Sequence, residues 1–286
     1  MSEMLLEPAK LTDAEFRWIQ KFLVERTGIE LKEGKQTLVM GRLERRVRHH
    51  GLSTYTEYFR YMQQDADEER MCVDLLTTNE TYFFRESQHF DRLPDLISDV
   101  EPGRPVRIWS AASSTGEEAY TIALTLAECL GRHRPWEVVG TDISGRVLET
   151  ARRGLYPIDA AAKIPRHLLQ AYCLKGRDDL DGFMTTQAWI RKRVSFSHAN
   201  LTEPLPDLGQ FDVVFLRNVL IYFGQETKRQ LIERIMQVTR PGGHLLIGHA
   251  ESVTGLVNDL IPIAPSVYRV PGGQRSPFIP DRQTSS

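Results

Sequence analysis

The sequence predicts an α/β protein in which a helical amino-terminal domain precedes a doubly wound, mostly parallel sheet. Up to about residue 95, apolar residues recur at helical spacing, and strand patterns do not begin before residue 105. From there on, short apolar runs alternate with helical segments, as expected for a parallel sheet with helices on both faces. One interval, between about residues 142 and 194, is longer than a single strand–helix–strand unit needs, which indicates an insertion.

The helical domain is placed at residues 1–90 and is expected to contain four helices. The first, "TDAEFRWIQKFLVERTG", begins with a capping box formed by Thr12 and Glu15 and ends at Gly28. The second runs from about residue 36 to residue 50. The third and fourth are expected in "TYTEYFRYMQQ" and "DEERMCVDLLTT".

The α/β domain is placed at residues 91–272, with the insertion at about residues 163–195. The expected strands are residues 107–110, 137–143, a strand near 194, 211–218, 243–251 and 265–270, and the expected helices are residues 116–130, 144–154 and 225–239. The tail, residues 273–286, is polar and rich in glycine and proline, and we expect it to be disordered.

The composition is that of an ordinary soluble chain of 286 residues with a formal net charge of −2. This charge argues against global binding to nucleic acid or to a membrane. No apolar run approaches the ~20 residues of a membrane span, and no signal peptide is recognisable. The three cysteines lack metal-ligand spacing, so we expect reduced thiols in a cytoplasmic protein without a metal site.

The segment "WSAASSTGEEAYTIA" has the form of a strand, a tight turn and a helix. A turn that binds a dinucleotide would carry G-x-G-x-x-G, which is missing here and argues against a nucleotide-dependent oxidoreductase. Glu117 and Glu118 follow the turn instead, and two carboxylates would repel a pyrophosphate. They suit a ligand with positive charge or hydroxyl groups, although they could also simply complement the helix dipole.

A second acid, Asp142, ends the next predicted strand. At that tip a carboxylate can accept hydrogen bonds from both ribose hydroxyls of an adenosine-type ligand. A ribose site without a pyrophosphate site indicates S-adenosylmethionine, whose sulfonium and amino groups are cationic. The turn "RPGG" before an apolar strand agrees with this interpretation, although alone it is just a tight turn.

Five motifs read in order carry a resemblance to the CheR family of chemotaxis receptor methyltransferases. They are "TTNETYFFRE", "SAASSTGEEAYTIA", "GTDIS", "FLRNVLIYF" and "RPGGHLLIGHAES". The resemblance runs from about residue 12 to residue 270. It implies a class I S-adenosylmethionine-dependent methyltransferase sheet with an all-α amino-terminal domain and a small inserted β-subdomain. The implied reaction is methyl transfer to receptor glutamates, giving methyl esters and S-adenosylhomocysteine. The alternative is a non-enzymatic S-adenosylmethionine-binding regulator of the same fold.

The same resemblance implies which residues form the site. Its motif positions assign cofactor contacts to Asn79, Thr81, Arg85, Glu117, Asp142, Asn200, Leu201, Arg217 and Asn218. Arg85 and Tyr222 are expected to orient the substrate carboxylate, because a guanidinium and a phenol can hold it without protonating it. The simpler alternatives are a surface ion pair for Arg85 and core packing for Tyr222. Ala119 stands where most members have proline, which should leave the chemistry intact.

A partner surface is expected on the helical domain. Between residues 17 and 60 there are ten lysines and arginines against five glutamates. Arg42, Arg45 and Arg46 gather on one arc, which is either a solvated basic face or a docking site for acidic receptor helices. The inserted β-subdomain resembles one that binds a receptor's carboxyl-terminal peptide in some family members, and otherwise would be a structural flap. We expect a monomer that neither binds nucleic acid nor inserts into the membrane.

Overall fold

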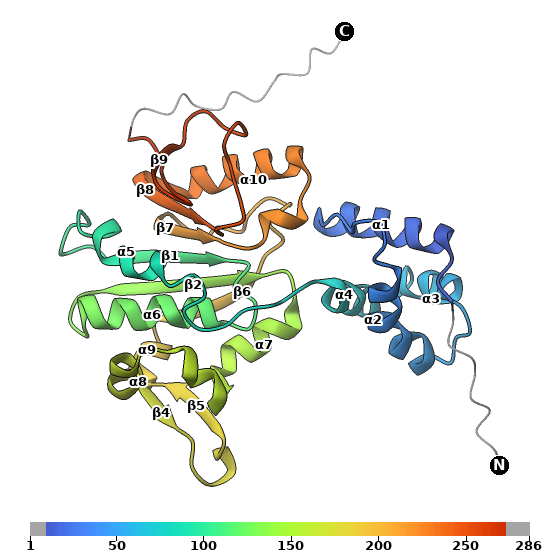
Figure 1. The fold of residues 1–286 in the computed structure, drawn as a ribbon, viewed down its shortest axis with the longest axis horizontal. Helices are drawn as coiled ribbons and strands as arrows, with labels where there is room; N and C mark the ends of the chain where they lie inside the picture. The colour runs from blue at the N-terminus through green and yellow to red at the C-terminus, as the bar shows by residue number, and fades with distance from the viewer. Residues whose placement is uncertain (1–9, 273–286) are drawn as a thin grey trace.

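The computed structural model describes residues 10–272, which form a helical domain beside a layered α/β domain (Figure 1). The predicted disordered tail, residues 273–286, lies outside the described residues. Within the described range, no helix is both long enough and apolar enough to cross a membrane.

The helical domain contains the four helices that the sequence predicts: α1 (Asp13–Thr27), α2 (Gln36–His49), α3 (Tyr55–Met62) and α4 (Ala66–Leu76). The capping box that opens α1 is confirmed, since Thr12 and Glu15 exchange side-chain to backbone hydrogen bonds. Gly28 ends the helix with φ of +70°, in the left-handed region. The apolar faces of the four helices enclose a separate core around Leu23, Leu43 and Tyr58.

The α/β domain is built on a seven-stranded sheet with the order β6-β2-β1-β7-β8-β10-β9. Its strands are β1 (Val106–Ala111), β2 (Trp136–Asp142), β6 (Val194–His198), β7 (Phe211–Leu216), β8 (Thr239–Ile247), β9 (Ile261–Ala264) and β10 (Val267–Arg269). The first five in spatial order pair in parallel, and β10 and β9 are antiparallel. The predicted class I methyltransferase-type sheet is therefore confirmed. The short edge strand β9 was not predicted from the sequence.

Helices cover both faces of this sheet (Figure 1). They are α5 (Gln88–Leu96), α6 (Glu117–Leu130), α7 (Gly145–Arg153) and α10 (Gln225–Val238). α5 and α6 pack against one face together with the inserted segment, and α10 packs against the other. α5 was missed at the sequence level because Pro94 lies inside it, yet its buried Phe90 and Leu93 hold it against the sheet.

The insertion forms a three-stranded antiparallel sheet of its own, with the order β3-β5-β4. Its elements are β3 (Leu155–Pro157), the 3-10 helices η1 (Ile158–Lys163) and η2 (Asp178–Leu180), α8 (Arg166–Tyr172), β4 (Cys173–Lys175), β5 (Phe183–Thr186) and α9 (Ala188–Arg191). The small sheet begins at Leu155 rather than near residue 163, because Gly154 ends α7 and the chain enters β3 directly. The next strand, β6, already belongs to the main sheet.

The two domains meet at the carboxyl ends of the parallel strands. Ile29, just after α1, forms an isolated antiparallel bridge with Phe223. The N–H of Glu30 donates to the carbonyl oxygen of Tyr222 at 2.8 Å. A side chain on Gly28 would come within 2.5 Å of Thr202, so glycine is needed for this close approach. The helical domain thus lies directly over the strand tips, where doubly wound sheets bind their ligands.

Candidate active site

The turn after β1 has an unusual backbone that aims its N–H groups at the next strand. Ala112 and Ser114 have φ of +65° and +50°, in the left-handed region that side chains rarely adopt. Gly116, with φ of +97°, ends the turn, and a Cβ there would lie 2.8 Å from the hydroxyl of Tyr156. The N–H of Ser113 donates to the carbonyl of Thr141 at 2.8 Å, which fixes the turn to β2. Strain of this kind is typical of functional turns.

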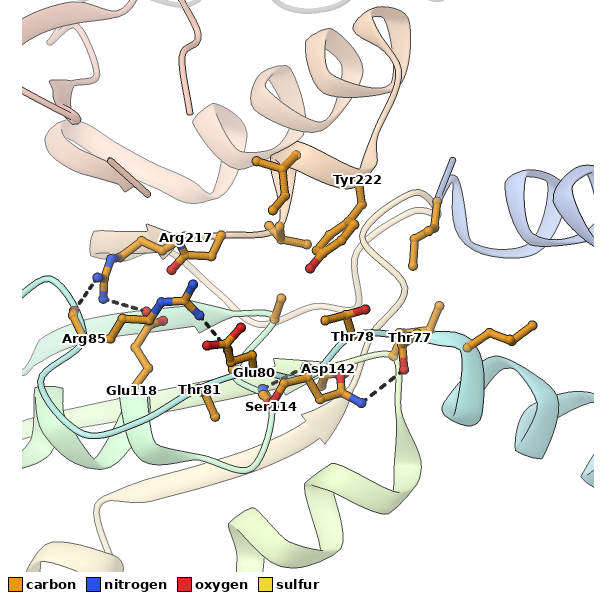
Figure 2. Close-up of a pocket in the computed structure, with 18 of the residues that line it drawn as sticks. Thr77, Thr78, Glu80, Thr81, Arg85, Ser114, Glu118, Asp142, Arg217 and Tyr222 are labelled. Carbon is orange, nitrogen blue, oxygen red and sulfur yellow. Dashed lines mark hydrogen bonds and ion pairs between the residues drawn. The ribbon is translucent and has the colours of Figure 1, made fainter. Parts of the chain in front are cut away.

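A cavity of about 480 Å³ opens beside this turn, between the helical domain and the strand tips (Figure 2). Its walls come from three parts of the chain: residues 29–42 of the helical domain, residues 76–90 of the connecting segment, and the ends of the parallel strands. The volume falls within the range of small-molecule sites.

Most of the residues assigned to the site from the sequence line this one cavity. They are Asn79, Thr81, Arg85, Asp142, Arg217, Asn218 and Tyr222. These residues come from the connecting segment, from β2 and from the 217–222 loop after β7, so the fold brings together positions far apart in sequence. The structure therefore collects most of the assigned residues at one place.

Three assigned residues do not line the cavity. The side-chain amide of Asn200 donates to the carbonyl of Arg26 at 2.8 Å, joining the two domains. Leu201 is buried in the core on the α10 face of the sheet. The carboxylate of Glu117 accepts a hydrogen bond from the hydroxyl of Thr115 at 2.6 Å, and burial raises its pKa. The neighbouring Glu118 lines the cavity instead.

Asp142 lies at the tip of β2 with both carboxylate oxygens already engaged. Oδ2 accepts from the N–H of Ser114 at 2.8 Å and Oδ1 accepts from the N–H of Ser144 at 2.9 Å. Burial raises the pKa of this carboxyl, and the two backbone hydrogen bonds oppose the rise. Each oxygen keeps a second lone pair, so the carboxylate can still accept from a bound hydroxyl group.

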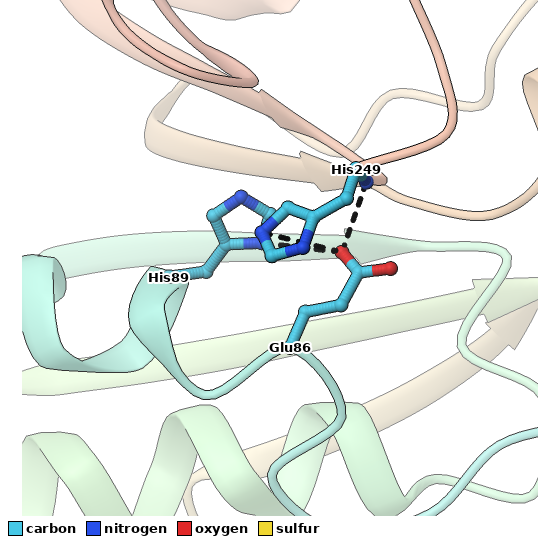
Figure 3. A group of neighbouring side chains, drawn as sticks. All are labelled: Glu86, His89 and His249. Carbon is cyan, nitrogen blue, oxygen red and sulfur yellow. Dashed lines mark hydrogen bonds and ion pairs between the residues drawn. The ribbon is translucent and has the colours of Figure 1, made fainter.

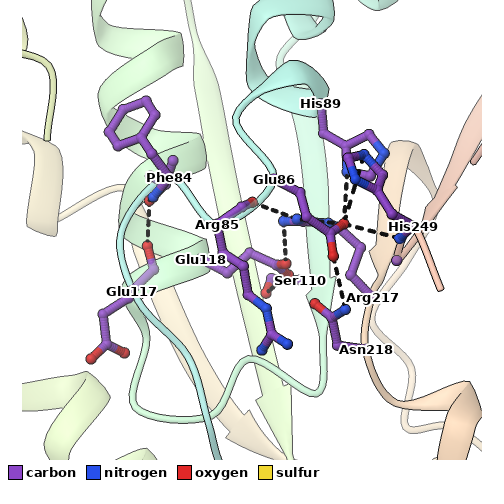
Figure 4. A network of polar contacts seen from close by, with 12 residues as sticks. Phe84, Arg85, Glu86, His89, Ser110, Glu117, Glu118, Arg217, Asn218 and His249 are labelled. Atoms are coloured by element: carbon purple, nitrogen blue, oxygen red, sulfur yellow. Dashed lines mark hydrogen bonds and ion pairs between the residues drawn. The ribbon is translucent and has the colours of Figure 1, made fainter. Parts of the chain in front are cut away.

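Arg217 is the centre of a buried ionic network behind the cavity (Figure 4). Its guanidinium donates to Glu118 at 3.0 Å and to Glu86 at 3.1 Å, and also to the backbone carbonyl of Arg85. Burial raises the pKa of Glu118, against the opposing charge of Arg217. Burial acts in the same direction on Glu86, but hydrogen bonds from Asn218 and Arg217 outweigh it and lower its pKa.

Glu86 also lies next to two histidines, His89 and His249, and the three offer ligand-type atoms within 4.8 Å of one another (Figure 3). The Glu86 carboxylate already accepts from Arg217, from the amide of Asn218 at 3.0 Å and from the N–H of His249 at 3.1 Å. His89 is buried, and burial with the Arg217 charge lowers its pKa to about 4. Because the carboxylate already accepts three hydrogen bonds and the Arg217 cation lies beside it, we interpret this cluster as part of the Arg217 network.

The two residues assigned to the substrate carboxylate occupy the cavity from opposite sides (Figure 2). One nitrogen of Arg85 donates to the backbone carbonyl of Glu80 at 2.6 Å, so the alternative of a side-chain ion pair with Glu80 or Glu86 does not describe it. Its other N–H groups remain available, since a guanidinium carries five. Tyr222 is half-buried and lies at the end of the 3-10 helix η3 (Leu220–Tyr222).

The three arginines expected to form one docking arc have different environments. Arg42 lines the cavity and donates to the carbonyls of Leu76 and Thr77, both at 2.9 Å. Arg46 forms an ion pair with the buried carboxylate of Glu68. Of the three, only Arg45 is exposed. Two of the three arginines therefore also make contacts within the helical domain, and the docking role of the set stays a prediction.

Sequence reasoning missed several residues of the site. Glu86 follows Arg85 in "FFRE" and was assigned no role in the site, and Glu118 was expected only, together with Glu117, to suit a cationic ligand or to complement the helix dipole, so its pairing with Arg217 was not predicted. The wall supplied by Lys32, Lys35 and Arg42 had no motif to indicate it, because it arises only when the helical domain closes over the strand tips.

Comparisons with known proteins agree with this geometry. The family model described as "CheR methyltransferase, SAM binding domain" matches residues 79–268, and "CheR methyltransferase, all-alpha domain" matches residues 14–77. The chain is 38% identical over 260 residues to chemotaxis protein methyltransferase 2 of Pseudomonas aeruginosa, covering 90% of this chain and 93% of that protein.

Two further relatives show the same relationship. The chemotaxis protein methyltransferase of Salmonella typhimurium is 37% identical over 90% of each chain. That of Escherichia coli is 37% identical over 88% of this chain and 89% of its own. These similarities favour an enzyme over a non-catalytic binding module. The chain belongs to the CheR family and is a methyltransferase with an S-adenosylmethionine-binding domain.

Proposed function

We propose that this protein transfers a methyl group from S-adenosylmethionine to glutamate side chains in the cytoplasmic helices of methyl-accepting chemotaxis receptors. The products are glutamate methyl esters and S-adenosylhomocysteine. The observation that carries the proposal is that Arg85, Tyr222 and Asp142 converge on one cavity at the strand tips. The chemotaxis protein methyltransferases that resemble this chain over most of their length support the choice of substrate.

The side chains of the cavity fit this cofactor by their charge. Asp142 offers carboxylate lone pairs to ribose hydroxyls at the tip of β2. Glu118 adds a carboxylate to the cavity wall, which would suit a cationic ligand, and Arg217 holds this carboxylate in place. We keep Glu117, Asn200 and Leu201 as proposed cofactor residues because of their motif positions, although they lie outside the cavity wall. Bound S-adenosylmethionine supplies an electrophilic methyl group.

The protein's own residues then have a positioning task. A glutamate with a pKa near ~4.3 is ionised at neutral pH, so its oxygen can attack without a general base. Arg85 and Tyr222 would hold this carboxylate in line with the methyl group, which lowers the entropic part of the barrier. Because opposite charges cancel in the transition state, exclusion of water by the closing walls favours the reaction. Nothing in the reaction requires a metal.

We further propose that the inserted β-subdomain binds a receptor peptide as an additional strand. β4 lies at one edge of its sheet, with β5 between it and β3. Leu174 on β4 is 49% exposed and Phe183 on β5 is 38% exposed, which offers apolar contacts to an added strand. The protein is proposed to act as a monomer. A cytoplasmic location is supported by three cysteines that are all free thiols.

Radiolabel transfer tests the main proposal. The protein would be incubated with S-adenosylmethionine labelled in its methyl group and with the cytoplasmic fragment of a methyl-accepting receptor. We expect label in the receptor that is released by mild base, as methyl esters are. A receptor in which the candidate glutamates are replaced by alanine is the control and should remain unlabelled.

Two outcomes would contradict the proposal. Label that stays with the receptor in base would show that the acceptor is not a carboxylate. Binding of S-adenosylhomocysteine by calorimetry without any transfer to receptors would instead support a regulatory module.

A receptor fragment lacking its carboxyl-terminal peptide, compared with the full fragment, tests the role of the β-subdomain.

A further inference from the structure

The turn after β8, residues 248–251, lies against the 217–222 loop that carries Tyr222. We propose that Glu251 in this turn is a positioning residue for methyl transfer, acting through the backbone of the 217–222 loop. The inference rests on the proposed role of Tyr222. Among the described residues, Glu251 is not part of the cavity lining, so we assign it a positioning role and no direct contact with substrate or cofactor.

The contacts of Glu251 are three backbone N–H groups. Its Oε2 accepts from the N–H of Asn218 at 2.9 Å and from that of Gly248 at 2.6 Å. Its Oε1 accepts from the N–H of Ile221 at 3.3 Å. Two of the three donors therefore belong to the loop, at positions 218 and 221. Hydrogen bonds to an ionised carboxylate are about twice as strong as neutral ones, so the carboxylate fixes both parts of the loop at once.

The loop needs such support because its backbone is strained. Asn218 has φ of +58°, in the left-handed region, which asparagine enters more readily than other residues with a side chain but which still needs local support. A left-handed residue of this kind persists when its surroundings hold it in place. Glu251 holds Asn218 through the N–H, while Glu86 holds the side-chain amide at 3.0 Å. Two carboxylates from different segments thus impose one backbone conformation.

The main chain of the turn that carries Glu251 lies very close to the 217–222 loop at Gly248. A Cβ on Gly248 would lie 2.5 Å from the side-chain nitrogen of Asn218 and 2.8 Å from Glu251 Oε2. Any larger residue at this position would have to push aside the side chains of Asn218 and Glu251, so glycine leaves room for the hydrogen bonds between the turn and the loop. We call the Glu251 carboxylate and the three N–H groups that it binds, those of Asn218, Ile221 and Gly248, the Glu251 clamp.

The clamp acts on one part of the site only. Arg217 is held independently by Glu86 and Glu118, and Asp142 by the turn after β1. Asn218, an assigned cofactor residue, keeps its side-chain hydrogen bond to Glu86 when the Glu251 carboxylate is lost. Loss of that carboxylate should therefore leave the cofactor residues in place and displace Ile221 and the adjacent Tyr222. We expect this displacement to lower kcat, because misplacing a positioned group by about 1 Å can cost roughly 100-fold in rate.

The test is Glu251→Gln, which keeps the size of the side chain but turns an NH2 group toward an N–H donor. We expect kcat for receptor methylation to fall by about tenfold or more, while the dissociation constant for S-adenosylhomocysteine stays within about twofold of wild type. The matched control is Glu226→Gln on α10, an exposed glutamate paired with Arg229, which should change neither quantity.

A second variant, Glu251→Asp, keeps the charge but withdraws the carboxylate from the loop. We expect kcat to fall less than in Glu251→Gln, and the dissociation constant for S-adenosylhomocysteine to stay unchanged again. If Glu251→Gln does not fold, this variant alone decides. Normal kcat in the folded variants, or a parallel loss of kcat and S-adenosylhomocysteine affinity, would overturn the inference. Wild-type protein in the same assay separates the two proposals, because a wrong substrate gives no transfer even by wild type.

Discussion

Arg217 donates to the carboxylate of Glu118 at 3.0 Å, and only 1% of the arginine side chain is exposed. A second carboxylate, Glu86, shares the same guanidinium. The pairing therefore joins the residue after β7 to the start of α6, which follows β1. Both positions lie at the carboxyl ends of neighbouring strands, beside the cavity. A buried pair of this kind makes each partner indispensable to the other, because an unpaired charge in such a place is costly.

We predict that Arg217→Met destabilises the protein by about 3–5 kcal/mol, because two carboxylates lose their buried partner. The free energy of unfolding in urea, measured at pH 7, checks this value. Arg229→Met is the control, since Arg229 is 42% exposed and its pairs with Glu226 and Glu233 lie on the surface. That change should leave the free energy of unfolding nearly unchanged, because exposed ion pairs contribute little. Equal losses from the two substitutions would contradict a structural role for the network.

Asp142→Asn should weaken binding of S-adenosylhomocysteine by more than about tenfold, because charged hydrogen bonds to the ribose are each worth about 1.5–3 kcal/mol. In the wild-type protein the carboxylate accepts hydrogen bonds from the N–H groups of Ser114 and Ser144. The amide of the variant would place an NH2 group opposite one of these donors. Calorimetric titration measures the affinity, and Asp179→Asn in the exposed part of the β-subdomain is the control. Undiminished affinity would mean that another residue holds the ribose.

Tyr222→Phe removes one hydroxyl group from the cavity. We expect kcat for receptor methylation to fall roughly 10- to 100-fold, as for the loss of one hydrogen bond to a charged group. The affinity for S-adenosylhomocysteine should remain within about twofold. Tyr268→Phe on β10, away from the cavity lining, serves as the control. If Tyr222→Phe turns over at the normal rate, the hydroxyl is not what orients the substrate carboxylate.

Charge reversal at Arg45 should slow receptor methylation at low salt without changing cofactor affinity or thermal stability. Arg45 is the exposed member of the predicted docking set, and its field can act on acidic receptor helices. The difference should shrink as salt rises, because exposed charges are screened over ~8 Å at physiological ionic strength. Arg153→Glu on α7, also exposed, is the control. A salt-independent effect would point to a local structural change instead.

The buried His89 should make stability depend on pH. Its pKa is lowered to about 4 from the model-peptide value of 6.5, so the unfolded chain binds a proton between these values that the folded protein does not. Stability is therefore expected to fall as the pH drops from about 6.5 to 4, by up to ~1.4 kcal/mol per pH unit. His89→Phe should flatten this part of the profile, whereas replacing the exposed His167 with phenylalanine should not. Chemical denaturation at several pH values measures both.

The sequence patterns predicted the main elements because each has a local cause. The capping box and Gly28 delimit α1, and buried runs such as Phe211–Leu216 can hardly be anything but central strands. The elements that were missed depend on tertiary packing. α5 forms despite Pro94 because Phe90 and Leu93 are buried against the sheet, and β9 is a short strand held only by β10.

The same distinction applies to the site. Asp142 could be assigned because a strand tip is a local feature of the sequence. The contacts of Glu118 and Glu86 could not, because they depend on Arg217, which lies 99 and 131 residues further along the chain. The contacts of Arg42 and Arg46 could not be predicted for a related reason. Helical periodicity places them on one arc but cannot show that their partners, the carbonyl of Leu76 and the carboxylate of Glu68, lie on α4.

The hydrogen bond between the N–H of Glu30 and the carbonyl of Tyr222 has a mechanical consequence. It makes the first loop of the helical domain an extension of the chain segment that holds the phenol. The Ile29–Phe223 bridge is a second link at the same place. If the receptor docks on the helical domain as proposed, the bound receptor would be connected through these two links to the backbone that carries the phenol, so docking and alignment of the substrate carboxylate would be coupled.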